Sequence, residues 1–142
     1  MYTQRFDEYA KLLADVGYSA VSAEQNTSWI NIALYRRVAI VIKAIAVGTS
    51  LNADVEIATS DGGTAHTLKS ITELGGSDDA ACVLISVRDE ELSKPSGAAS
   101  DQYDWIRLET TPSGSCTYVV LIFGLEPRYA PVGATEWDEV VA

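Results

Sequence analysis

Short apolar runs recur through most of this chain, and the turn residues between them constrain its fold more than any other feature. From Trp29 to Phe123 the runs are rich in β-branched and aromatic residues, and each is bounded by Gly, Asp, Asn, Ser or Pro. Such runs are typical of antiparallel strands, because these side chains pack well on a pleated sheet and the bounding residues favour turns. The pattern predicts an antiparallel β-sandwich. About seven strands are expected, at residues 28–33, 36–47, 53–59, 66–72, 81–88, 103–110 and 116–123.

The spacing of apolar residues within two runs predicts which faces are buried. Val38–Val47 is apolar on both faces, as a central strand covered on both sides would be. In a later run apolar and acidic residues alternate, which predicts that Val55 and Ile57 point inward. Asp54 and Glu56 are then expected to face water.

The run that contains Arg107 leaves two arrangements open. Either Tyr103 and Trp105 share a face with Arg107, or Ile106 and Leu108 form the buried face. If Ile106 and Leu108 form the buried face, the aromatic rings are left available for a partner.

One segment, near the N-terminus, has helical spacing. Thr3 can cap its start and Gly17 can end it. Residues 18–28 are small and polar without a period, which predicts a connecting arm. The predicted helix carries its apolar side chains at i, i+3, i+4 and i+7, namely Phe6, Tyr9, Ala10, Leu13 and Val16.

The end of the chain predicts a different structure again. Pro127 and Pro131 disfavour a strand and favour an extended tail. We therefore expect three parts: a helix and connecting arm at 1–26, a β-sandwich domain at 27–125 and an extended tail at 126–142.

Charge and hydropathy narrow the function. The chain has 20 acidic and 10 basic residues and a formal charge of -10, a field that repels phosphate, so nucleic acid is not an expected partner. The longest apolar run is short and contains Lys43, so a membrane is not expected either. Residues 1–5 lead into Asp7 and Glu8, and an export signal is not expected.

No pattern of reactive residues predicts an enzyme, a cofactor or a metal. The one histidine, His66, has no nucleophile motif around it. Carboxylate groups such as Asp89–Glu91 fit exposed acidic turns better than catalytic pairs. The loops at Asp61 and at 77–79 offer oxygens for calcium but lack a full ligand pattern.

The two cysteines, Cys82 and Cys116, show neither metal-ligand nor redox spacing. Two unreactive thiols in or near strands are expected, with a disulfide between neighbouring strands as the alternative.

Four segments together resemble small virion proteins of tailed bacteriophages: Thr27–Val38, Val55–Leu74, Val83–Leu92 and Val120–Val132. The most specific part of the resemblance is an opening with Trp29 followed by Tyr35-Arg36-Arg37. It is combined with an ending in which Gly124 precedes Pro127-Arg128-Tyr129. The resemblance implies a β-sandwich on the phage particle, namely a head decoration (cement) protein on the outer capsid surface.

We therefore expect a non-enzymatic virion protein, made in the host cytoplasm, that binds the major capsid protein, with copies of itself as an additional candidate partner. The predicted helix and the acidic tail are expected to reach neighbouring subunits; the alternative is that the helix covers an open end of the sandwich. The expected contact residues are Phe6, Tyr9, Leu13, Arg128, Tyr129 and Trp137.

Two other functions stay open. A head-tail connector or tail component would occur in few copies per virion, and a decoration protein in hundreds. A carbohydrate-binding β-sandwich would use aromatic rings as stacking surfaces, with Trp105, Tyr103 and Tyr118 beside Asp104 and Glu109.

Overall fold

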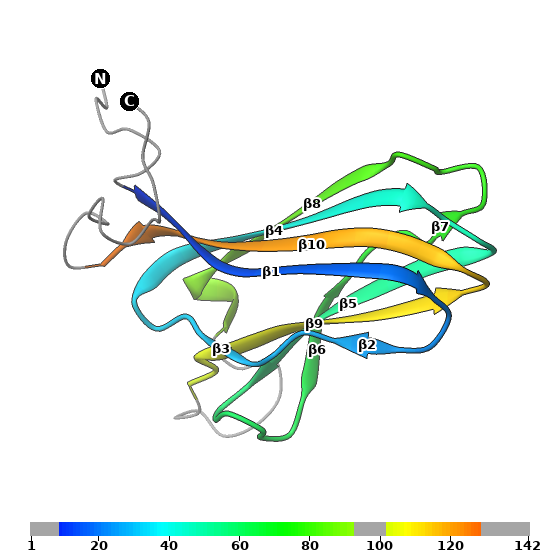
Figure 1. The fold of residues 1–142 in the computed structure, drawn as a ribbon. Helices are drawn as coiled ribbons and strands as arrows, with labels where there is room; N and C mark the ends of the chain where they lie inside the picture. Colours follow the sequence, from blue (N-terminus) through cyan, green and yellow to red (C-terminus); the bar gives the residue numbers. More distant parts are fainter. Residues whose placement is uncertain (1–8, 93–101, 129–142) are drawn as a thin grey trace.

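The computed structural model describes residues 9–92 and 102–128, and it shows two antiparallel sheets packed face to face (Figure 1). The strands are β1 (Ala10–Val21), β2 (Gln25–Asn26), β3 (Ile30–Asn31), β4 (Tyr35–Ala46), β5 (Ser50–Ala58), β6 (His66–Ser70), β7 (Leu74–Gly75), β8 (Cys82–Arg88), β9 (Trp105–Ser113) and β10 (Cys116–Pro127). A one-turn 3-10 helix, η1 (Asp89–Leu92), follows β8.

The strand order is that of a jelly roll. One sheet has the order β1-β10-β4-β8, and the other has the order β2-β9-β5-β6, with β3 also paired to β9 and β7 to β5. The chain crosses repeatedly between the sheets, so the first and last long strands lie side by side in the same sheet (Figure 1). Four strands in each sheet, connected in this way, form the double-sheet jelly roll, and the short strands β3 and β7 extend the second sheet to six strands. The predicted antiparallel β-sandwich is therefore confirmed.

The inward faces of the two sheets form one core. Side chains of β4 and β10 meet those of β5 and β9, and all of them are fully or almost fully buried. Each such Val, Leu or Ile contributes about 1.5–3 kcal/mol through removal from water. The residues at the centre of this layer are Ile40, Ile42, Val120, Ile122, Val55, Ile57, Ile106 and Leu108.

The seven predicted strands correspond to β3, β4, β5, β6, β8, β9 and β10. β10 runs to Pro127, four residues beyond its predicted end, because its last residues still pair with β4 (Pro127 with Tyr35). Pro127 then ends the strand, in agreement with its missing N–H group.

The predicted N-terminal helix is wrong: Ala10–Val21 is the edge strand β1, paired antiparallel along β10. In this strand Ala14, Val16 and Tyr18 alternate toward the core opposite Ile122, Val120 and Tyr118. Two register shifts, at Leu12/Ala14 and at Tyr18/Val21, interrupt that alternation. The apolar residues of the strand are therefore spaced in a way that also fits the period of a helix. Pairing with β10 favours the strand over the helix, because β10 provides hydrogen-bond partners for the backbone N–H and C=O groups along β1.

The predicted connecting arm at 18–28 is largely strand. β1 continues to Val21, and after a short turn β2 pairs with β9 in the opposite sheet (Gln25 with Thr110). Residues 10–26 thus add one strand to each sheet. Phe6 and Thr3, the other expected helix residues, lie outside the described residues.

β4 was expected to be covered on both faces, and the described residues cover only one of them. Its central position, between β10 and β8, is confirmed. Val38, Ile40, Ile42 and Ala44 are buried, but Ile45 on the opposite face is 56% exposed. Within the described ranges no helix has the length and apolar character needed to cross a membrane.

Candidate docking surfaces

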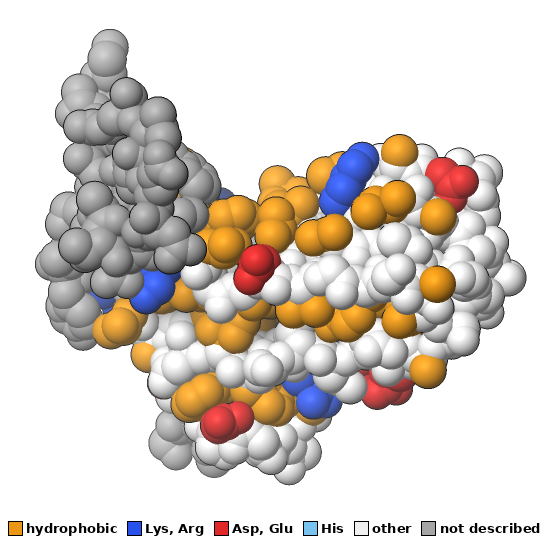
Figure 2. Space-filling model, in the orientation of Figure 1, with side chains coloured by type: hydrophobic (Ala, Val, Ile, Leu, Met, Phe, Trp, Pro, Cys, Tyr) orange, Lys and Arg blue, Asp and Glu red, His pale blue; other side chains and the backbone are white. Residues whose placement is uncertain are grey.

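The outer face of the β1-β10-β4-β8 sheet is apolar, and we call it the apolar outer face. Residues that oppose each other across antiparallel strands point to the same side, so the register places its side chains in rows, such as Leu121, Val41 and Leu84. Leu84 is 67% exposed and, among residues 9–92 and 102–128, no further layer covers this face. Figure 2 shows the hydrophobic side chains gathered across it. Its members are Leu12, Ala39, Val41, Ile45, Leu84, Val119, Leu121 and Phe123.

Among the described residues, few charged side chains lie on the apolar outer face, and most of them are toward its border. Asp15 lies on the edge strand β1, opposite Leu121. Lys43 donates a hydrogen bond to the carbonyl oxygen of Ala80, at the turn before β8. Arg37 and Arg88 oppose each other in the strand register, at the end of the rows. An apolar centre with a polar rim is the arrangement found in protein–protein interfaces.

The apolar outer face continues to the end of the sandwich where the terminal segments begin. Ala10 pairs with Leu125, so the start of β1 and the end of β10 lie together. Of the expected contact residues, Tyr9, Leu13 and Arg128 are at this end. Phe6, Tyr129 and Trp137 lie outside the described residues.

Arg128 and Leu13 make contacts within the protein itself. The Nε of Arg128 donates to the carbonyl oxygen of Ala33 (2.8 Å), and the Nη2 lies 2.9 Å from Asp89 Oδ2. Leu13 is half-buried against the core. The contacts of Arg128 fasten the end of β10 to the turn before β4 and to η1.

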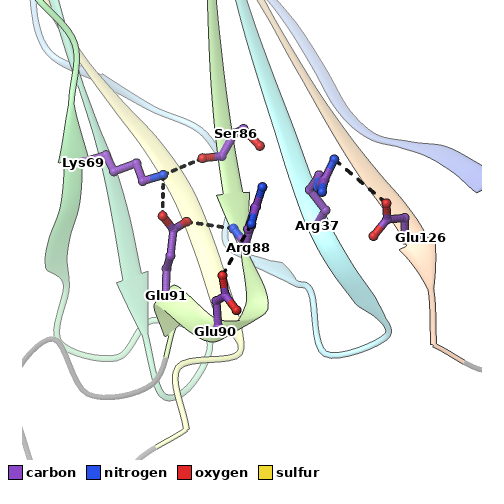
Figure 3. Close-up of polar contacts among 7 residues, drawn as sticks. All are labelled: Arg37, Lys69, Ser86, Arg88, Glu90, Glu91 and Glu126. Atoms are coloured by element: carbon purple, nitrogen blue, oxygen red, sulfur yellow. Dashed lines mark hydrogen bonds and ion pairs between the residues drawn. The ribbon is translucent and has the colours of Figure 1, made fainter.

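A polar network covers the free edge of β8 (Figure 3). Lys69, on β6 of the other sheet, donates to the carbonyl oxygen of Ser86 (2.6 Å) and pairs with Glu91 (2.9 Å). Glu91 also accepts a hydrogen bond from the backbone N–H of Arg88 (2.8 Å). Burial alone would raise the pKa of Glu91, but the N–H of Arg88 and the ammonium of Lys69 outweigh it and lower that pKa. Figure 3 also shows the weaker pairs Arg88–Glu90 and Arg37–Glu126 (3.7 and 3.9 Å).

The edge network has a structural consequence. A free edge strand offers unpaired N–H and C=O groups to other chains, and charged side chains on the edge discourage such pairing. Lys69 occupies the carbonyl oxygen of Ser86, and Glu91 occupies the backbone N–H of Arg88, so neither group is available to another strand. The network also ties the edges of the two sheets together.

The other sheet presents a polar face with aromatic residues, which we call the polar outer face. On it Arg107 lies between Glu56 and Trp29: its Nε donates to Glu56 Oε2 (2.5 Å), and its Cζ is 4.6 Å from the centre of the Trp29 ring. Glu56 was expected to face water, and it is buried because this ion pair covers it. The full set is Trp29, Asn31, Trp105, Arg107, Glu56, Thr67, Asn26, Glu109, Asp54 and Ser70.

The aromatic residues of the predicted carbohydrate surface do not lie together. The structure buries Ile106 and Leu108, so Trp105 lies on the polar outer face. Tyr103 and Tyr118 are both buried, and neither can stack on a ligand. Tyr118 shares a 2.5 Å hydrogen bond with Thr110 Oγ1 in the core. Trp29 and Arg107 were not among the expected carbohydrate-contact residues, because only the strand register brings them to one face.

The residues considered for chemistry have local roles. His66 packs edge-on against the Tyr103 ring, with 5.4 Å between ring centres. Asp78 and Asp79 accept hydrogen bonds from the N–H groups of Gly75 (2.7 Å) and Val47 (2.8 Å). In the part of the chain that the structure describes, no group of three His, Cys, Asp or Glu side chains is placed to hold a metal.

The two cysteines are free thiols, so the alternative of a disulfide is wrong. Cys116 is buried and receives a hydrogen bond from the N–H of Gly48 (3.4 Å). Cys82 was also expected to be inert, and it is exposed at the start of β8.

No protein-family model and no curated protein sequence matches the chain. Among solved structures, it is similar to a chain of the Triatoma virus empty capsid, with a TM-score of 0.50 and 11% identity over 88% of this chain and 94% of that one. It is also similar to PirA (TM-score 0.45, 12% identity, 82% and 94% covered). The family 11 carbohydrate-binding module from Clostridium thermocellum gives a TM-score of 0.45 at 12% identity, with 84% and 97% covered. At these identities the similarity shows the β-sandwich fold alone.

Proposed function

We propose that this protein is a non-enzymatic structural component of a tailed-phage virion that binds the outer surface of the capsid and reinforces it. The observation that supports this most is the apolar outer face, on which Leu84 and Ile45 remain 67% and 56% exposed. Large exposed apolar patches on soluble proteins mark interaction sites. The partner is the major capsid protein, and the face would lie against its outward surface.

The size of the apolar outer face fits a contact that includes the terminal segments. Its rows extend over about 20 Å along the strands and about 17 Å across them, or about 350 Å². A stable interface buries about 800 Å² per partner. We propose that residues 1–8 and 129–142 supply the remainder of the contact through Phe6, Tyr129 and Trp137.

The first test is the protein composition of purified particles of the phage that encodes this chain, measured by mass spectrometry. The proposal predicts one copy per few major capsid subunits. About six or twelve copies per particle would instead place the protein in a head-tail connector or tail ring. Absence from particles would contradict a virion role altogether.

The second test asks which surface binds. We expect Leu84→Glu to fold normally, since the side chain is exposed, and to lower particle occupancy at least tenfold. Thr111→Glu adds the same charge to the opposite sheet and is expected to leave occupancy unchanged. Deletion of residues 1–8 or 129–142 should each lower occupancy without removing a described strand. Equal occupancy for Leu84→Glu and wild type would show that the apolar outer face is not the contact.

A further inference from the structure

The polar outer face carries the mixture of groups that a sugar requires, arranged in three adjacent rows. One row holds Trp29, Arg107, Glu56 and Thr67, because Arg107 and Glu56 oppose each other and Glu56 opposes Thr67. In the next row Trp105 lies between Asn31 and Ala58. On the other side, Glu109 lies between Asn26 and Asp54, and Asp54 opposes Ser70. Two indole rings and several hydrogen-bonding groups therefore share one surface.

The centre of the polar outer face is preorganised. Arg107 is held on one side by Glu56 at 2.5 Å and on the other by Trp29 at 4.6 Å from the ring centre. The side chain of Glu56 is only 11% exposed and that of Arg107 only 23%. A planar guanidinium fixed in this way holds the indole in one orientation, so a ligand would meet a surface that is already ordered.

The charges on the polar outer face restrict the ligand. Glu109 is surrounded by other carboxylates, and burial followed by repulsion from Glu56, Glu24 and Asp54 raises its pKa. An anionic ligand would be repelled by this group. Arg107 lies over the Trp29 ring and pairs with Glu56, so these two opposite charges already balance each other at the centre of the face.

A neutral sugar fits what remains. Its C–H face can pack on an indole ring, and its hydroxyl groups can both donate to carboxylates and accept from amides and guanidinium. We propose that the polar outer face binds a neutral oligosaccharide, with Trp29 and Trp105 as stacking platforms and with Arg107, Glu109 and Asn26 as hydrogen-bonding partners. This site is separate from the apolar outer face, so it does not depend on the proposed capsid function.

The test uses the free full-length protein and isothermal titration against neutral cello-, xylo-, manno- and chito-oligosaccharides. An oligogalacturonate represents anionic sugars, and a lysine-rich peptide represents cations. We expect binding to at least one neutral series and to neither charged probe. Trp29→Ala and Trp105→Ala should each weaken that binding at least about tenfold, through loss of a stacking surface.

Two further variants separate a binding role from a folding role. Trp29→Phe keeps an aromatic ring and is expected to stay within about threefold of wild-type affinity. Leu84→Ala, on the opposite sheet, should not change the affinity for the oligosaccharide. Circular dichroism checks that each variant folds. No binding to any neutral series, binding to a charged probe alone, or neutral binding that survives both tryptophan-to-alanine changes would overturn the proposal.

Discussion

Gly124 lies directly against an aromatic ring, which leaves no room for a side chain. A Cβ atom added there would lie 2.7 Å from the Tyr35 ring, which is itself 8% exposed. We predict that Gly124→Ala lowers the free energy of unfolding by about 1–3 kcal/mol, the usual cost of overpacking. Urea unfolding followed by circular dichroism measures it.

Gly17 provides the matched control for that experiment. It lies on β1, and a Cβ there meets no atom within 4 Å. Gly17→Ala should therefore leave stability unchanged or raise it slightly, because alanine restricts the unfolded chain. Equal stability for the two variants would contradict the packing of Tyr35 on Gly124.

The buried hydroxyl group of Tyr118 makes the free energy of unfolding depend on pH above pH 10. Burial, partly offset by the hydrogen bond with Thr110, raises the pKa of Tyr118 to about 12 from 10.0. Between pH 10 and 12 the Tyr118 hydroxyl loses its proton in the unfolded chain and keeps it in the folded protein. The free energy of unfolding is therefore highest below pH 10 and declines as the pH rises toward 12. The loss is about 2–3 kcal/mol. Burial also raises the pKa of the neighbouring Tyr18, which acts in the same direction.

Tyr118→Phe tests this interpretation of the alkaline region. At pH 7 the variant should be about 0.5–1.5 kcal/mol less stable, because it loses one hydrogen bond. Thr110 keeps its contact with the carbonyl oxygen of Gln25 (3.3 Å). Between pH 10 and 12 the gap to wild type should narrow. An unchanged gap across this range would place the titrating group elsewhere.

At the scale of elements, the free edge of β8 depends on Lys69. We predict that Lys69→Ala changes the midpoint of urea unfolding little, because part-exposed ion pairs contribute only about 0–1 kcal/mol. It should nevertheless increase association, since the carbonyl of Ser86 becomes available to another strand. Light scattering against concentration measures this, with Arg36→Ala as a control of equal charge. Identical scattering for the two variants would show that Lys69 does not protect the edge.

The elements also show what the sequence could predict. Runs of β-branched residues between turns specify strands locally, so the seven strands after residue 28 were found, and Val55 and Ile57 point inward as predicted. β1 was not found, because its alternation is broken by two register shifts and its partner, β10, is more than 90 residues away. The polar outer face was missed for a related reason. Trp29, Glu56 and Arg107 are far apart in the sequence and meet only through the register.

At the scale of the whole molecule, the apolar and polar outer faces lie on opposite sides of one sandwich (Figure 1). A copy bound to a capsid through the apolar outer face would present the polar outer face to the surroundings. With many copies per particle, weak sugar contacts would act together, and linked binding sites can exceed the single-site affinity by about 10²–10⁴.

This geometry predicts that particles bind a sugar-coated surface far more tightly than the free protein does. The comparison uses surface plasmon resonance on the oligosaccharide that the free protein binds, with three kinds of particle. Wild-type particles should dissociate at least about a hundredfold more slowly than free protein. Particles made with Trp29→Ala should keep their occupancy and lose retention, whereas Leu84→Glu should lose both while its free protein still binds sugar. If Trp29→Ala particles were retained like wild type, the polar outer face would not be the outward-facing surface.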